Sequence, residues 1–205
     1  MTLLPTTQPG DDTASPTART LLDAARSAEG EVPNYVRAFA TRPAVYAAWR
    51  GLVGAVMGAM DHRTYEIATV GAARGLRSTY CSLAHGEVVL TSYVDRGELT
   101  SLLAAADARD VEGARTRDEA VAAFAAKVAT AAGTVDAADI AALRSHGVDE
   151  QEALDIVLAA AARCFFSTVL DATATPPDAG FGLRLPADLV EELAVGRPPA
   201  PTRPS

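Results

Sequence analysis

A cysteine and a histidine stand four residues apart in the stretch LRSTYCSLAH, residues 76–85. Ser78 is a good N-cap residue, so we expect a helix to begin there with Cys81 in its first turn. The unpaired backbone N–H groups and the positive end of the helix dipole lie at that turn, and both stabilise a thiolate. His85 follows one turn later on the same face, and its ring exchanges protons near neutral pH. The pair therefore predicts nucleophilic or acid–base chemistry.

The same spacing also suits two interior residues, because a free cysteine is one of the commonest residues in protein cores. The wider sequence has to decide between a working thiol and a buried one. Cys164 is the only other cysteine, and it lies in the apolar stretch AAARCFFSTV, where core packing is the simpler interpretation. No disulfide framework is predicted from two distant cysteines, and both should be reduced thiols in a cytoplasmic setting.

The elements that would position these residues are predicted to be helices throughout. Apolar residues make up 49% of the 205-residue chain, but Ala dominates them and aromatic residues amount to only 5%, which favours packed helices over sheets. No segment alternates with a period of two. Helices are expected at 17–30, 32–42, 43–60, 62–75, 80–97, 98–107, 116–133, 134–147 and 149–172.

The chain is predicted to be an all-α bundle of eight to ten helices. One domain, 17–195, should lie between a disordered tail at 1–16 and a disordered Pro-rich tail at 196–205. The similar helical patterns of 34–107 and 116–173 suggest an internal duplication. Spacings of three and four predict inward faces in two of the helices. These faces comprise Val45, Trp49, Leu52, Val53, Val56, Met57 and Met60 in one helix and Leu154, Val157, Leu158, Ala161 and Phe165 in the other.

Charge and hydropathy exclude several classes of function. The net charge is −8 and no basic cluster is present, which argues against nucleic-acid binding and against anionic membrane surfaces. There is no run of 18 apolar residues and no signal-peptide pattern at the start, so we expect a cytoplasmic protein. The three histidines form no zinc-like arrangement with the cysteines, and no Gly-rich phosphate loop occurs. No metal and no cofactor are predicted.

Glu66 completes a recognisable pattern with the thiol and the histidine. The chain carries E-x11-S-x2-C-x3-H through Glu66, Ser78, Cys81 and His85. This resembles the E-x11-C-x2-C-x3-H signature of the alkylhydroperoxidase D and carboxymuconolactone decarboxylase superfamily. The flanking stretches VPNYVRAFATRPAVYAAW, MDHRTYEIATVGAARG and SHGVDEQEALDIV are also similar to that family, so the resemblance covers roughly residues 30–178.

The resemblance implies an alkylhydroperoxidase D-like helical bundle that assembles as a trimer or hexamer. It implies that Cys81 attacks a hydroperoxide while His85 and Glu66 relay protons. Ser78 stands where the redox family has its resolving cysteine, so the intramolecular disulfide cycle is closed and an external thiol reductant would be needed. Tyr80 precedes the cysteine. Its hydroxyl could donate a hydrogen bond in the site, or it could be only the solvated end of a ring that packs in the core.

Two alternatives remain open at this stage. One is an acid–base enzyme of the carboxymuconolactone decarboxylase type, in which Glu66 and His85 move protons on a small lactone or carboxylate. Its weakness is the lack of a clear basic clamp, for which only Arg74 and Arg77 lie nearby in sequence. The other is a non-enzymatic oligomeric relative that has lost the paired cysteines.

His62, His146 and Glu87 are predicted to be surface or helix-end residues.

Overall fold

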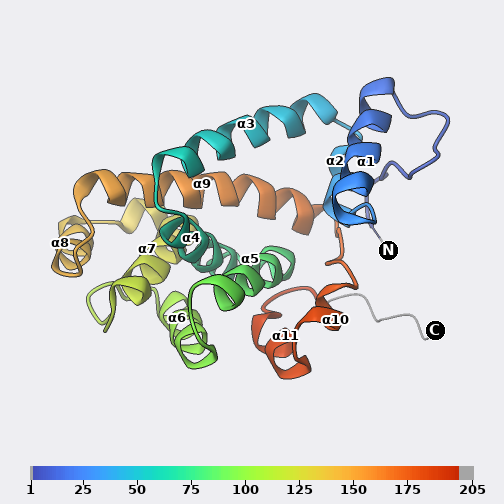
Figure 1. Cartoon of the computed structure of the whole chain (residues 1–205). Coiled ribbons are helices and arrows are strands. Elements are labelled where there is room, and N and C mark those ends of the chain that lie inside the picture. The colour runs from blue at the N-terminus through green and yellow to red at the C-terminus, as the bar shows by residue number, and fades with distance from the viewer. Residues whose placement is uncertain (1, 199–205) are drawn as a thin grey trace.

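The computed structural model describes residues 2–198, and all regular structure in that range is helical, as the composition predicted (Figure 1). Helices form because Ala-rich segments lose little side-chain entropy. Six of the α-helices also begin at a Ser, Thr or Asp whose side chain caps the first turn. The helices are α1 Pro16–Glu29, α2 Asn34–Phe39, α3 Pro43–Ala59, α4 His62–Gly75, α5 Thr79–Ser92, α6 Arg96–Ala108, α7 Arg117–Ala131, α8 Ala137–Ser145, α9 Glu150–Ala172, α10 Phe181–Arg184 and α11 Ala187–Leu193, with a 3₁₀ turn at Ala132–Thr134.

Helix α4 forms the centre of the bundle together with α7. Nearly every α4 residue from Thr64 to Ala73 is buried, and α4 packs against α5, α6, α7 and α9. Small residues allow the two central helices to come close. A Cβ on Gly71 would lie only 2.4 Å from the carbonyl oxygen of Ala122 in α7. Helix α4 ends at Gly75, as predicted, and this glycine lies against α7. Arg77, in the turn that follows, takes the left-handed conformation at φ 58°.

The sequence predicted where most of the helices begin. Asp61 caps α4 by accepting the N–H of Thr64, and Asp136 caps α8 in a capping box. The predicted helix 80–97 is wrong at its end, because the chain turns after Ser92 and Asp95 begins α6 with a second capping box. The sequence reading also missed α10 and α11, which are too short to show a convincing apolar period.

Helices α3 and α9 lie side by side along one edge of the fold, and their predicted inward faces are partly wrong (Figure 1). Leu154, Leu158 and Phe165 are exposed by 51%, 43% and 41%. The inner side of α9, which packs on α4 and α7, instead combines alanines with the larger Ile156, Phe166 and Leu170. On α3, Val45 and Leu52 are also exposed, by 46% and 52%, whereas Val56 is buried. The two long helices therefore present large apolar side chains outward.

Helix α9 is long and apolar enough to cross a membrane by length and composition, with a mean hydropathy of 1.8 in its most apolar window. However, 56% of that window is buried inside the described fold, as expected for a core helix of a globular domain.

The predicted tails fall partly within the described range. The N–H of Leu3 donates to the carbonyl of Thr173 at 2.8 Å, and that of Thr7 donates to Arg37 at 3.0 Å. Helix α1 begins at Pro16, within one residue of the predicted boundary. At the other end, Gly196 donates its N–H to Thr79 Oγ1 at 2.9 Å, and residues 199–205 of the second tail lie outside the described residues. Disorder of the tails and the internal duplication stay predictions.

The close approach of α4 and α7 gives a test of the fold. Gly71→Ala should lower the free energy of unfolding by about 1–3 kcal/mol, because the new methyl group meets helix backbone that cannot move aside. Gly58→Ala in α3 is the matched control, since nothing lies within 4 Å of its Cβ, and it should be neutral or stabilising by up to about 1 kcal/mol. Urea unfolding of both variants measures the difference. Equal stability of Gly71→Ala and the parent chain would contradict the observed packing.

Candidate active site

The three residues at the centre of the sequence motif line one pocket. Helix α4 contributes Glu66, and α5 contributes Cys81 and His85 from its first two turns. The Glu66 Oε2 atom lies 2.6 Å from His85 Nδ1. Cys81 is only 1% exposed, yet it faces this cavity of about 410 Å³. The residues that the spacing placed on one face are therefore brought together around a common space.

His85 is held in a state suited to accept a proton. Burial lowers the pKa of its imidazole below the ordinary 6.5, the nearby positive charge of Arg163 lowers it further, and the hydrogen bond to Glu66 opposes both. The imidazole is therefore neutral at pH 7. A neutral ring that faces a carboxylate through Nδ1 donates its N–H to that carboxylate, which leaves the lone pair on Nε2. Glu66 thus fixes the orientation and tautomer of the base.

Arg163 of α9 is the residue in the site that the sequence reading missed. Its side chain is buried, with the residue 4% exposed, and Nη1 lies 3.5 Å from Cys81 Sγ. Its guanidinium carbon lies 5.4 Å from the centroid of the Phe166 ring. Nε has no hydrogen-bond partner, and no described carboxylate forms an ion pair with this arginine. A buried cation with so little compensation favours an anion beside it.

The rest of the pocket is lined mainly by aromatic and apolar side chains. Most of them come from α2, α3 and α9, and Tyr65, Tyr80 and Ala84 come from α4 and α5, the helices that also carry Glu66, Cys81 and His85. The aromatic members are Tyr35, Tyr46, Trp49, Tyr65, Tyr80 and Phe166, and the others include Arg50, Val53, Gly54, Met57 and Ala84.

Tyr80 lines the pocket, but its hydroxyl is engaged elsewhere. It donates to Asp178 in the segment before α10 and accepts the backbone N–H of Tyr35 at 3.5 Å. Asp178 also accepts the N–H of Asn34 at 2.8 Å. Helix α2 has Pro33 at its N-cap and no side-chain cap of its own, so Asp178 and Tyr80 together satisfy its first turn. Of the two roles considered for Tyr80, the structure supports a packed ring with a structural hydroxyl.

Burial raises the pKa of the Tyr80 hydroxyl well above its usual value, and the adjacent Asp178 raises it further. Burial likewise raises the pKa of the Asp178 carboxyl. The phenol therefore remains a protonated hydrogen-bond donor at all ordinary pH values.

Ser78 occupies the predicted N-cap position of α5 and places Cys81 as the third helical residue. Its hydroxyl makes no capping bond, however, and is buried without a hydrogen-bond partner. Ser78 does not line the pocket. Cys164 is half-buried and turned toward the carbonyl of Ala129, 3.8 Å away, and burial raises the pKa of its thiol. Neither residue faces the space that Cys81 faces.

The remaining candidates lie outside the pocket. Arg74 binds Asp107 and the carbonyl of Glu192, so neither it nor Arg77 is a clamp for a ligand there. Glu87 pairs with Arg184 at 2.6 Å and is less solvated than predicted. As expected, His62 is exposed at the start of α4 and His146 ends α8. Among the described residues, no group of three or more His, Cys, Asp or Glu side chains could hold a metal ion.

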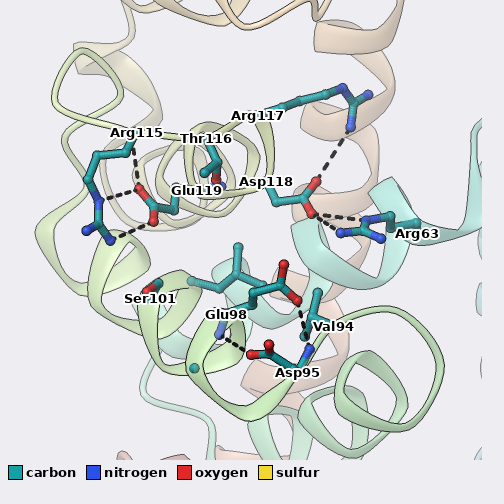
Figure 2. Close-up of a pocket in the computed structure, with 12 residues that line it drawn as sticks. Arg63, Val94, Asp95, Glu98, Ser101, Arg115, Thr116, Arg117, Asp118 and Glu119 are labelled. Carbon is teal, nitrogen blue, oxygen red and sulfur yellow. Dashed lines mark hydrogen bonds and ion pairs between the residues drawn. The ribbon is translucent and has the colours of Figure 1, made fainter.

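A second cavity, of about 940 Å³, opens beside the start of α7 (Figure 2). Its arginines are compensated by neighbouring carboxylates. Arg63 pairs with Asp118 at 2.6 Å, and Arg115 pairs with Glu119 at 2.7 Å. Arg117, beside them, pairs with Glu152. The cavity contains no cysteine or histidine, so we place the chemistry in the smaller pocket around Cys81.

Comparison with known proteins is informative at the level of structure. No family model and no curated protein sequence matches this chain. Solved structures do match. An uncharacterised peroxidase-related protein from Ralstonia eutropha JMP134, described as an alkylhydroperoxidase AhpD core, superposes with a TM-score of 0.68 at 23% identity over 90% of this chain and 97% of its own. The chain has the alkylhydroperoxidase D-like fold.

Two further structures support that fold. An uncharacterised peroxidase-related protein from Silicibacter sp. TM1040 has a TM-score of 0.68 at 25% identity, covering 86% of this chain and 94% of its own. The debrominase Bmp8, in a cysteine-to-alanine variant in complex with 2,3,4-tribromopyrrole, has a TM-score of 0.67 at 15% identity, covering 93% and 100%. The resemblance predicted from the motif is thereby confirmed for the alkylhydroperoxidase D-like fold.

A weak signal for Arg163 was present in the sequence. It is the only charged residue between Asp155 and Asp171, in the middle of an apolar helix, and a charge in such a run needs a buried partner. Asp178 offered no comparable signal, because its partners lie more than 90 residues away. The aromatic lining is likewise gathered from separate helices.

The electrostatics of His85 give a second test. Titration followed by NMR should give a pKa below 6.5 in the parent chain, because burial and Arg163 disfavour the imidazolium. Arg163→Met should raise that pKa and Glu66→Gln should lower it, since the first removes a repulsive charge and the second an attractive one. Glu87→Gln is the control and should leave it unchanged, because Glu87 is paired with Arg184. If both variants shifted the pKa of His85 in the same direction, the opposing electrostatic effects assigned to Arg163 and Glu66 would be contradicted.

Proposed function

We propose that the protein reduces organic hydroperoxides as a thiol oxidoreductase that uses a single cysteine, Cys81. The observation that carries this proposal is the contact between the buried guanidinium of Arg163 and the Cys81 sulfur at 3.5 Å. A positive charge beside the sulfur stabilises a thiolate, and the first turn of α5 adds the effect of its unpaired N–H groups. His85 lies in the same pocket as a neutral base.

The oxidation step can be written with these groups alone. His85 Nε2 accepts the thiol proton of Cys81, and the thiolate attacks the terminal oxygen of the hydroperoxide. A sulfur–oxygen bond forms while the oxygen–oxygen bond breaks. His85 returns the proton to the departing alkoxide, so that Cys81 becomes a sulfenic acid and the substrate becomes an alcohol. Sulfur is oxidised by two electrons and the peroxide is reduced by two. Arg163 stabilises the negative charge before and during the transfer.

The sulfenic acid then has to be reduced by a thiol from outside the chain. Ser78 cannot form a disulfide, and Cys164 faces Ala129 rather than the pocket. One external thiol condenses with the sulfenic acid to give a mixed disulfide and water. A second external thiol releases the Cys81 thiol and leaves as the oxidised disulfide. A low-molecular-weight thiol is therefore the proposed partner in each cycle.

The structural comparisons support this proposal at a coarser level. Two of the similar structures carry the description "peroxidase-related". The debrominase Bmp8 binds a flat halogenated ring in the same fold, which agrees with a pocket built from aromatic side chains.

An acid–base reaction of the carboxymuconolactone decarboxylase type is the second candidate. The sequence offered no basic clamp for a carboxylate, but Arg163 supplies a buried guanidinium in the pocket. A lactone or carboxylate bound to Arg163 would leave His85 to move the proton, and Cys81 would be dispensable. A non-enzymatic relative is the third possibility, supported by Ser78 alone.

The outward apolar side chains of α3 and α9 support the predicted assembly. We call this surface the α3–α9 apolar face, and it comprises Val45, Leu52, Leu154, Leu158 and Phe165. Four of these five line one shallow groove of about 430 Å³. Contiguous exposed apolar surface of this kind marks interaction sites. We propose that copies of this chain cover it in a trimer or hexamer.

The peroxidase proposal is tested with one equivalent of cumene hydroperoxide followed by mass spectrometry. Cys81 should gain a single oxygen that dimedone traps, and Cys164 should remain unmodified. Turnover with glutathione as reductant should be lost in Cys81→Ser and lowered about 10²–10⁴-fold in His85→Gln. Cys164→Ser is the matched control and should retain it. A Cys81 thiol that stays reduced while free glutathione is oxidised would overturn the proposal.

The acid–base alternative gives the opposite pattern in the same variants. Ring opening or decarboxylation of a small lactone would survive in Cys81→Ser and disappear in His85→Ala. If no substrate is turned over, and Glu66→Gln changes neither the reactivity of Cys81 nor the stability of the fold, the non-enzymatic hypothesis is supported.

Assembly is tested by size-exclusion chromatography with multi-angle light scattering. The parent chain should elute as a trimer or hexamer, and Leu158→Glu should elute as a smaller species, because a charge in the middle of the α3–α9 apolar face opposes its burial. Leu183→Glu is the control, since Leu183 is 83% exposed on α10 and lies outside that face. A monomeric parent chain would refute the assembly.

A further inference from the structure

The pocket around Cys81 has an aromatic wall that the peroxide step does not use. Tyr35, Tyr46, Trp49 and Phe166 form it, and we call these four side chains the aromatic wall. The rings of Trp49 and Phe166 are stacked with centroids 4.3 Å apart, and Trp49 is also stacked on Tyr46 at 6.1 Å. The indole N–H of Trp49 donates to the carbonyl of Ala162 at 3.3 Å. The wall is therefore fixed in place before a ligand arrives.

The wall provides apolar surface that the fold itself does not cover. Tyr46 and Phe166 are buried, but Trp49 and Tyr35 are only half-buried beside the cavity. Transfer of an apolar group from water onto such surface is favourable, and aromatic rings prefer stacked or edge-to-face contacts with another ring. A ligand with a flat apolar ring would gain from both effects.

The volume of the pocket also favours a substrate larger than hydrogen peroxide. The cavity of about 410 Å³ is within the range of small-molecule sites, whereas a single water occupies about 30 Å³ in the liquid. Hydrogen peroxide is only slightly larger than water and would leave most of the wall uncontacted. Space for a substituent therefore lies next to the sulfur.

One glycine of α3 keeps part of that space open. Helix α3 carries Gly51, Gly54 and Gly58, although glycine is about 1 kcal/mol less favourable than alanine inside a helix. Of these, Gly54 lines the pocket, and no atom lies within 4 Å of the Cβ that a larger residue would place there. Gly51 has equally open surroundings but does not line the pocket.

We infer that the substrates of this site are aralkyl hydroperoxides, in which an aryl ring is joined through a saturated carbon to the peroxide group. The ring binds against the aromatic wall while the peroxide group reaches Cys81. This inference rests on the proposed function for its chemistry but not for its binding step. Trp49 is the single tryptophan of the chain and lines both the pocket and the groove of the α3–α9 apolar face. A fluorescence change that Gly54→Leu weakens and Gly51→Leu retains therefore reports on the wall.

Binding is measured with 2-phenyl-2-propanol, the unreactive alcohol product of cumene hydroperoxide. It should change the Trp49 emission in a saturable way, at concentrations about tenfold lower or more than tert-butanol requires, in both the parent chain and Cys81→Ser. In turnover, kcat/KM for cumene hydroperoxide should exceed that for tert-butyl hydroperoxide by about tenfold or more. Gly54→Leu should reduce this ratio at least about fivefold, because its side chain enters the space for the ring. Gly51→Leu is the matched control and should keep the parent ratio.

The outcomes separate the inference from the proposed function. Equal responses to the two alcohols, or equal kcat/KM for the two hydroperoxides, would overturn the aryl preference while peroxide turnover still supports the function. Ring-selective binding without any peroxide turnover would support the ligand class and reject the peroxidase. If Gly54→Leu fails to fold, which circular dichroism would show, the alcohol comparison in the parent chain still decides.

Discussion

The site depends on one buried positive charge. Arg163 reaches the Cys81 sulfur from α9, is almost completely removed from water, and has no described carboxylate to pair with. Such a guanidinium is costly unless negative charge lies close to it, so the same contact that makes the arginine tolerable favours an ionised sulfur or an anionic ligand. Burial lowers the pKa of His85, and the charge of Arg163 lowers it further, so the base is neutral. One buried charge thus acts on both reactive groups.

The sequence predicted the positions that lie close together along the chain. Spacing predicted that Cys81 and His85 share one face of a helix, and the resemblance to the alkylhydroperoxidase D signature added Glu66 from the preceding helix. Arg163 comes from a helix more than 70 residues away, and which side of that helix faces the site depends on packing. The helical fold itself followed from composition and caps, which are local properties.

The errors in the helix faces have a common physical origin. Both sides of α9 are apolar, and the sequence reading chose the side with the larger residues, Leu154, Leu158 and Phe165. The fold instead buries the side that carries Ala153, Ala159, Ala160 and Ala162 together with Ile156, Phe166 and Leu170. Apolar spacing alone therefore does not identify the core side of this helix, and Leu154, Leu158 and Phe165 lie outside the core. They remain available for surfaces between molecules.

The cap of α2 also bears on how the chain matures on the ribosome. The first turn of this helix carries Tyr35, and its backbone donors find acceptors on Tyr80 and on Asp178, 144 residues beyond Asn34. During synthesis the amino-terminal helices emerge long before that carboxylate does. Until Asp178 has been made, the N–H of Asn34 lacks its partner, so the cap of the helix turn that carries Tyr35 is completed late in synthesis.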